Sequence, residues 1–194
     1  MDNNSSFNQA VVLAAELHKD QFRKGSGIPY MSHLMGVASL AMEASVYCDA
    51  GSTTDIGIGA LLHDAIEDQG HQITLEDIEN KFGAVPAEIV RDCTDTDIVP
   101  KPPWKARKQA YIDSVATKAK CSQLVSAADK LHNARAIVFD HSRLGAQVFD
   151  RFSVEATEVV WYYQSLHKAF ESSWRENPLL PQLAEAVTGL SKAA

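Results

Sequence analysis

Residues 60–69 read ALLHDAIEDQ, a stretch that joins an apolar core segment to a cluster of ionisable side chains. The apolar residues lead directly to His63 and Asp64, and the acids Glu67 and Asp68 follow. On an α-helix, residues four positions apart share a face, so His63 would lie beside Glu67 and Asp64 beside Asp68. We therefore expect a core helix whose polar side opens into a cleft.

Three carboxylates held close together repel one another, and a buried carboxylate without a partner is costly. A divalent cation would supply the missing positive charge, whereas a lone His-Asp pair would suit a solvated surface equally well. Further candidate ligands are His33, which follows PYMS, and Asp129, which lies among small and apolar residues. Aspartate is unfavourable inside a helix unless its side chain has a role. Two imidazoles and two carboxylates suit Mn²⁺, and ligand type does not exclude Zn²⁺ or Fe²⁺.

The rest of the chain favours helices, since apolar residues recur at helical spacing and strand patterns are scarce. Ser32 is the expected N-cap of the second helix, and Thr74 with Asp77 resembles a capping box. We find no internal repeat or linker and predict an all-α fold with a single domain over residues 1–194. The expected helices cover residues 7–24, 33–47, 54–69, 75–82, 87–95, 104–119, 121–139, 153–170 and 179–193.

Composition restricts the classes of function. The 194 residues are 45% hydrophobic and carry a net charge of −7, which suits a globular protein and disfavours nucleic-acid binding. No apolar run approaches the roughly 20 residues of a membrane-spanning helix, and the polar N-terminus lacks the pattern of a secretory signal. Three widely spaced cysteines argue against a disulfide framework. We expect a cytoplasmic protein without membrane partners, and a homo-oligomer stays open.

The candidate ligands and their neighbours resemble a known family. His33, His63-Asp64 and Asp129 follow the H…HD…D pattern of HD-domain phosphohydrolases. The segments HKDQFRKGSGIPYMSH, ALLHDAIED and AADKLHNAR are similar to the hydrolase domain of RelA/SpoT-type enzymes, and most similar to stand-alone small alarmone hydrolases. The resemblance is strongest over residues 18–137, and at this length we expect no synthetase domain.

This resemblance implies an HD-type helical fold and an enzyme of the stringent response. The implied reaction removes the 3′-pyrophosphate from the alarmone (p)ppGpp or (p)ppApp, a small nucleotide substrate, with Mn²⁺ as cofactor. His33, His63, Asp64 and Asp129 are the implied metal ligands. A metal lowers the pKa of bound water and neutralises charge that builds on phosphoryl oxygens, which suits this reaction.

The other implied site residues surround these ligands. Glu67 and Asp68 match acids beside the attacking water, and their spacing does not decide which one is the base. The implied substrate-binding residues are Arg23, Lys24, Lys130 and Asn133. Without the resemblance, Arg23 and Lys24 would be interpreted as charges that satisfy the dipole at the end of the first helix.

Several points stay open in the sequence. Leu34, Gln69 and Gly70 depart from the usual family residues next to the ligands and acids, so guanine or adenine preference is undecided. Basic residues near 101–108 are expected at the rim of the site, and Asp95 and Asp97 in a capped turn. Alternative functions are an HD phosphohydrolase for other nucleotides or phosphomonoesters, and a non-catalytic nucleotide-sensing module.

Overall fold

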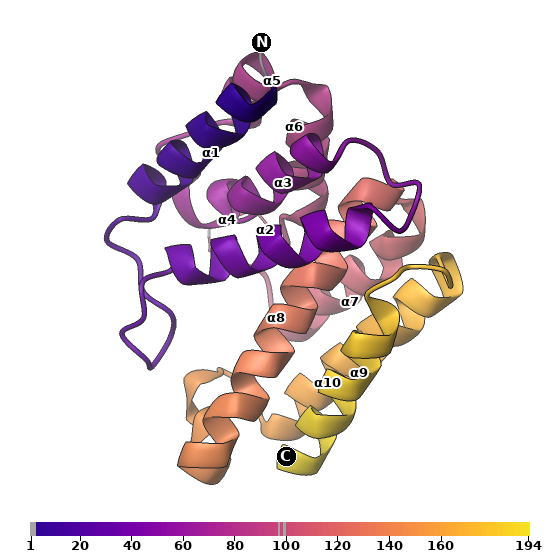
Figure 1. The fold of residues 1–194 in the computed structure, drawn as a ribbon. Coiled ribbons are helices and arrows are strands. Elements are labelled where there is room, and N and C mark those ends of the chain that lie inside the picture. Colours follow the sequence, from indigo (N-terminus) through magenta and orange to yellow (C-terminus); the bar gives the residue numbers. More distant parts are fainter. Residues whose placement is uncertain (1–2, 97, 99) are drawn as a thin grey trace.

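A computed structural model describes residues 3–96, 98 and 100–194 (Figure 1). Asp97, which the sequence places in a capped turn, lies outside these residues. The predicted all-α class is confirmed, and β pairing in the described part of the chain is limited to a bridge between Phe22 and Pro29. The elements are α1 (Asn3–Leu17), α2 (Met31–Ser45), α3 (Thr53–Leu62), α4 (Ala65–Gln69), α5 (Leu75–Phe82), α6 (Ala84–Cys93), α7 (Trp104–Ser114), η1 (Val115–Thr117), α8 (Lys120–Leu144), η2 (Gly145–Arg151), α9 (Ala156–Ser173) and α10 (Leu180–Ala193).

Helix α3 forms the centre of the N-terminal half, where it contacts α1, α2, α6 and α8. All its residues from Ile56 to Leu62 are buried, which explains why its sequence is apolar on every side. Figure 1 shows α2 crossing the start of α8, and α8, α9 and α10 running alongside one another in the C-terminal half. No helix among the described residues has the length and apolar character that crossing a bilayer requires.

The first helix ends earlier than predicted. Helix α1 stops at Leu17, and residues 18–30 form a loop that the sequence pattern placed partly in the helix. Arg23 and Lys24 therefore lie on this loop, and the interpretation of their charges as partners of a helix dipole is wrong.

A tight turn closes the loop. The Arg23 N–H donates to the Ile28 carbonyl at 2.8 Å. Between them Gly25 and Gly27 have φ values of 69° and 66°, a conformation that costs glycine little and other residues more. The glycines that seemed to end a helix instead build a turn that presents two basic side chains.

Other boundaries also shift. Helix α2 begins at Met31 with Tyr30 at its N-cap, so the prediction of Ser32 as the N-cap is wrong. The capping box of α5 is confirmed, since the Thr74 hydroxyl accepts the Asp77 N–H at 3.1 Å and the Asp77 carboxylate accepts the Thr74 N–H at 2.9 Å. Helix α7 gives way to η1 earlier than expected, and α8 continues beyond its predicted end.

The predicted helix over residues 54–69 is interrupted at the HD pair. Asp64 has φ −98° and ψ 1° between α3 and α4. The His63 ring lies against the last turn of α3, where its Nδ1 is 2.7 Å from the Ala60 carbonyl oxygen. A backbone hydrogen bond of the helical type still joins the Asp68 N–H to the Asp64 carbonyl at 2.9 Å. The acid pair thus still follows one turn after the HD pair.

Close packing of α3 on α6 depends on Gly59, and its replacement tests this contact. A Cβ at Gly59 would lie 2.7 Å from Ile89 Cγ2 and 2.8 Å from Ile89 Cβ, which cannot move without the α6 backbone. Overpacking of this kind costs about 1–3 kcal/mol, against a gain in helix propensity of about 1 kcal/mol. We expect Gly59→Ala to lower the free energy of unfolding measured by urea denaturation.

Gly189→Ala in α10 is the matched control. It gains the same helix propensity, and its new Cβ would approach Val138 no closer than 3.3 Å. This variant should unfold at the same urea concentration as the wild type or higher. Equal stability of the two variants would contradict the packing argument.

Candidate metal centre and nucleotide site

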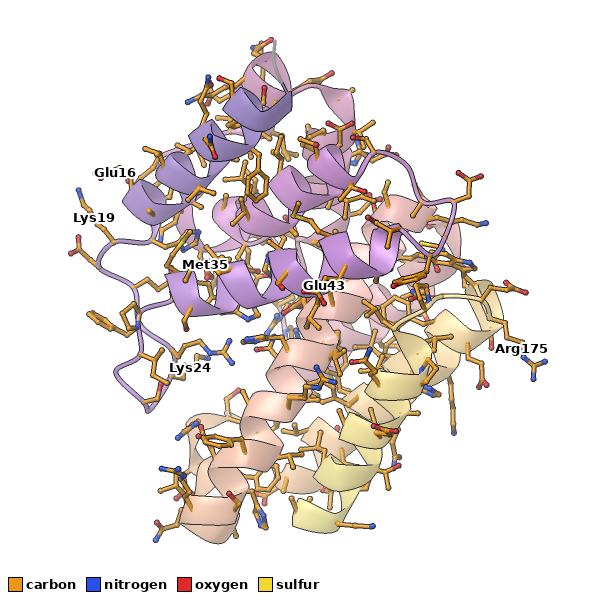
Figure 2. All side chains as sticks on the ribbon, viewed as in Figure 1. Glu16, Lys19, Lys24, Met35, Glu43 and Arg175 are labelled. Atoms are coloured by element: carbon orange, nitrogen blue, oxygen red, sulfur yellow. The ribbon has the colours of Figure 1, made fainter. Side chains whose placement is uncertain are left out.

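The structure brings the four predicted metal ligands together from three parts of the chain. His33 lies in the first turn of α2, His63 and Asp64 lie between α3 and α4, and Asp129 lies in the buried half of α8. Figure 2 shows Met35 on the outer side of the same helix α2. His33 faces inward two positions earlier and is fully buried.

The ligand atoms are close enough to share one ion. His63 Nε2 is 3.0 Å from Asp64 Oδ2, and His33 Nε2 is 3.7 Å from the same oxygen. Ligand atoms of His33, His63 and Asp64 all lie within 4.8 Å of one another. Asp129 falls outside that threefold group, yet its Oδ1 lies 3.2 Å and 3.7 Å from the two Nε2 atoms. We include Asp129 because these direct distances join it to both imidazoles.

The chemistry of these donors fits a divalent cation. Within the described residues, the Nε2 atoms of His33 and His63 are buried and have no hydrogen-bond partner. Buried polar atoms are nearly always paired in folded proteins, so two such atoms facing two carboxylates point to a ligand. Imidazole nitrogen and carboxylate oxygen together suit Mn²⁺, Fe²⁺ or Zn²⁺.

The far side of each imidazole contacts a different group. His63 Nδ1 lies 2.7 Å from the backbone carbonyl oxygen of Ala60. His33 Nδ1 lies 2.9 Å from Nδ1 of His132, a residue of α8. Burial, together with His33 and Arg23, lowers the pKa of His132 to about 4.

Tyr30 is a site residue that the sequence did not reveal. Its hydroxyl donates to Asp64 Oδ2 at 2.6 Å, and its ring stacks on His18 with 5.3 Å between centroids. Burial and the negative charge of Asp64 raise the pKa of Tyr30, so the phenol keeps its proton. The PY dipeptide was visible in the sequence, but only the folded loop places the hydroxyl on the carboxylate.

The buried charges perturb one another. Burial lowers the pKa of His33. Burial also opposes the charged form of His63, but Asp64 and Asp129 outweigh it and raise its pKa well above the ordinary value. Burial favours the neutral carboxylic acids, yet His63 holds the pKa of Asp64 low and Lys130 holds that of Asp129 low. The two carboxylates are therefore ionised at neutral pH.

The two predicted catalytic acids lie in different surroundings. Glu67 accepts a hydrogen bond at each oxygen, from Lys101 Nζ at 2.8 Å and from the Asp95 N–H at 3.1 Å. Asp68 accepts one bond from the Gln21 side chain, at 2.7 Å. Burial and then the nearby Asp64 raise the pKa of Asp68.

A group of hydrogen-bonded side chains around Gln21, which the sequence did not reveal, holds Asp68. The Gln21 amide oxygen lies 2.7 Å from His18 Nδ1 and accepts from the Gln69 side chain at 2.8 Å. These contacts orient the Gln21 amide so that its nitrogen donates to Asp68. His18 is thus a buried histidine that lies just after α1 and contacts Gln21.

Three of the four predicted substrate-binding residues form a connected group. Arg23 Nη1 donates to Asn133 Oδ1 at 2.8 Å, and Asn133 Nδ2 donates to Asp129 Oδ1 at 2.5 Å. Lys130 Nζ donates to Asp129 Oδ2 at 2.6 Å. Figure 2 shows Lys24 on the loop between α1 and α2, where it makes no hydrogen bond or ion pair with another described residue.

The basic residues near 101–108 do not all form a solvated rim. Lys101 reaches Glu67, and Lys105 pairs with Glu158 on α9. Arg107 and Lys108 both pair with the buried carboxylate of Asp95, whose N–H in turn contacts Glu67. Asp95 therefore links the start of the loop before α7 to the acid pair, a role that a capped turn alone would not require.

Comparison with known proteins agrees with this architecture. Residues 10–153 match the HD domain family. Over 130 residues the chain is 36% identical to the Danio rerio protein named guanosine-3′,5′-bis(diphosphate) 3′-pyrophosphohydrolase MESH1, and the match spans 66% of either chain, slightly less than two thirds.

Solved structures share the fold. One, described as a metazoan ortholog of SpoT that hydrolyzes ppGpp, superposes with a TM-score of 0.73 and 24% identity over 94% of either chain. Another, lmo0812 from Listeria monocytogenes EGD-e, has a TM-score of 0.69 and 27% identity, and covers 82% of this chain and 99% of its own. Both likenesses extend beyond the ligand-bearing helices.

Metal binding should stabilise the folded protein, because only folding brings the four ligands together. We expect Mn²⁺ to raise the melting temperature, with about 2.7 kcal/mol of stabilisation at a concentration 100 times the dissociation constant. Asp64→Ala should remove most of this rise while its far-ultraviolet circular dichroism stays helical. Glu43→Ala, an exposed acid on α2, is the control and should keep the rise. A wild type that Mn²⁺ does not stabilise would contradict the site.

Proposed function

The chain belongs to the HD domain family, and from this membership we propose that it is a metal-dependent pyrophosphohydrolase that removes the 3′-pyrophosphate from (p)ppGpp. The products would be pyrophosphate and the corresponding guanosine 5′-phosphate nucleotide. The convergence of two imidazoles and two carboxylates beside a pair of acids and a basic loop carries this proposal. The names of relatives such as the Danio rerio protein support the choice of substrate.

We propose that His33, His63, Asp64 and Asp129 hold the metal, and that the metal is Mn²⁺. When bound, such an ion polarises a phosphoryl oxygen and lowers the pKa of water in its coordination shell. Zn²⁺ and Fe²⁺ share these ligand preferences, so metal analysis of the purified protein should accompany the activity assays.

Asp68 is the stronger candidate for the general base. Both oxygens of Glu67 are engaged, one of them by a cation, which weakens its capacity to accept a proton. Asp68 accepts a single neutral donor from Gln21 and its raised pKa moves it toward the range in which a base works well at neutral pH. Glu67 then serves to fix Lys101 and the Asp95 backbone.

Arg23, Lys24, Lys130 and Asn133 are proposed to bind the nucleotide. Arg23 and Lys24 project from a loop whose turn is fixed by two glycines, and guanidinium groups pair well with phosphate. Lys130 and Asn133 already bond to Asp129, so they can join the metal centre to the substrate. We propose that the whole chain of 194 residues acts as a single domain in this reaction.

Product analysis tests the proposed reaction. Purified protein with Mn²⁺ and ppGpp should release pyrophosphate with matching formation of GDP, and Asp64→Ala should abolish release. Release of orthophosphate instead would favour a broader phosphohydrolase, and binding of ppGpp without turnover would favour a sensor. The same assay with ppApp measures base preference.

Two amide variants test the choice of base. Asp68→Asn should lower kcat by about 10²–10⁴-fold, the usual contribution of general base catalysis. Glu67→Gln breaks an ion pair to the half-exposed Lys101 and should lower kcat by less than about tenfold. Steady-state kinetics on both variants at saturating Mn²⁺ give the comparison. A larger loss for Glu67→Gln would reverse the assignment.

A further inference from the structure

The back of one candidate ligand is held by a second histidine. His132 follows Asp129 by three positions in α8, so the two side chains project near the same face of that helix. Its Nδ1 lies 2.9 Å from Nδ1 of His33, and the ring centroids are 4.8 Å apart with an interplanar angle of 58°. This contact crosses from α8 to α2 and lies on the side of His33 opposite the carboxylates.

The geometry fixes what each nitrogen must do. His33 Nε2 faces Asp129 and Asp64, so its lone pair must be free if His33 binds a cation. A neutral imidazole carries one proton, which must then be on Nδ1. That proton needs an acceptor, because the ring is buried, and the only atom recorded within hydrogen-bonding distance among the described residues is His132 Nδ1.

The other candidate histidine is held differently. His63 Nδ1 contacts the carbonyl of Ala60, three residues earlier in the same segment. A backbone carbonyl can only accept a hydrogen bond, so the orientation of the His63 ring is set by the backbone of α3 itself. Among the described residues His33 Nδ1 makes no hydrogen bond to a backbone carbonyl, and it contacts a side chain from another helix instead.

The backbone of α2 leaves space for the His132 ring. A Cβ at Gly36, three residues after His33, would lie 2.5 Å from both Cδ2 and Nε2 of His132. Any residue larger than glycine would therefore push the ring away from His33. Gly36 sits inside a helix, where glycine costs about 1 kcal/mol relative to alanine, and room for this ring gives that cost a physical reason.

We propose that His132 is a positioning residue of the metal centre, whose Nδ1 accepts the Nδ1–H of His33 and so aims the His33 Nε2 lone pair at the cation. Gly36 is the residue that admits the His132 ring to this place. The inference rests on the metal-binding role of His33 in the proposed function. Partners of this kind set the tautomer and basicity of metal-bound histidines, and their loss commonly lowers metal affinity about 10–100-fold.

Mn²⁺ affinity of the purified full-length protein, measured by isothermal titration calorimetry and by electron paramagnetic resonance of free Mn²⁺, tests this role. His132→Leu removes the acceptor and should weaken Mn²⁺ binding about 10–100-fold. His132→Asn places an amide oxygen near the position of Nδ1 and should restore most of the affinity. His141→Leu, a histidine on the same helix without a contact to His33, should bind Mn²⁺ as the wild type does.

Gly36→Ala separates positioning from the chemistry of the side chain. It keeps every polar group yet displaces the His132 ring, so it should also weaken Mn²⁺ binding, although alanine favours the helix. The melting temperatures of the metal-free proteins show whether each variant folds. If His132→Leu does not fold, the Mn²⁺ affinity of Gly36→Ala tests the proposal in its place. Wild-type affinity in Gly36→Ala or His132→Leu, or an asparagine variant as weak as the leucine variant, would overturn the proposal. A wild type that binds no Mn²⁺ would overturn the metal centre as well.

Discussion

The close approach of two imidazoles and two carboxylates is the constraint to which the rest of the structure responds. Ionised carboxylates lose their hydrogen bonds to water when they are buried, and hydrogen bonds from fixed protein groups must replace them. Here Tyr30 donates to Asp64, while Lys130 and Asn133 donate to Asp129. These donors come from the N-cap of α2 and from α8, the two helices that carry the candidate ligands His33 and Asp129.

The packing of the helices follows from the same requirement. Helix α3 leads directly to the HD pair and packs against α1, α2, α6 and α8, which fits the burial of all its residues from Ile56 to Leu62. Glycines lie where a helix backbone packs closely against a side chain of a neighbouring helix, at Gly59 against Ile89 and at Gly36 against His132. The interruption between α3 and α4 lets His63 turn back against its own helix while Asp64 stays beside it.

The sequence predicted the helical class, because apolar periodicity is a local signal. It named His33 and Asp129 as candidate partners of the HD pair from their residue types, and the resemblance to HD-domain phosphohydrolases joined the four into one set. It failed where a short turn or a break in the helix interrupts the apolar periodicity. The first helix seemed to continue through Arg23, but a turn that bonds Arg23 to Ile28 replaces its last turns. Periodicity likewise suggested an unbroken helix through the HD pair.

Three further residues that contact the candidate site were missed because their partners are far away in the chain. Tyr30, Gln21 and His132 act through contacts with residues 34, 47 and 99 positions away in the chain. Spacing carries no signal for such contacts, although the glycine three residues after His33 is a sequence feature that a search for close helix packing could have used.

The loop that presents Arg23 contacts the C-terminal half of the molecule at two points, and this bears on how a nucleotide would be bound. Through Asn133, Arg23 is connected to Asp129, so the basic loop and the candidate metal centre share one chain of hydrogen bonds. On its other side, Gly25 packs against Arg151 so tightly that a Cβ would lie 2.6 Å from the guanidinium Nε, and Arg151 is itself paired with Asp140 of α8. A loop segment that is already held by such contacts loses less conformational entropy when a ligand arrives. These contacts hold the Arg23 side chain close to Asp129, one of the candidate metal ligands, so the turn would present this guanidinium to a nucleotide from a fixed position.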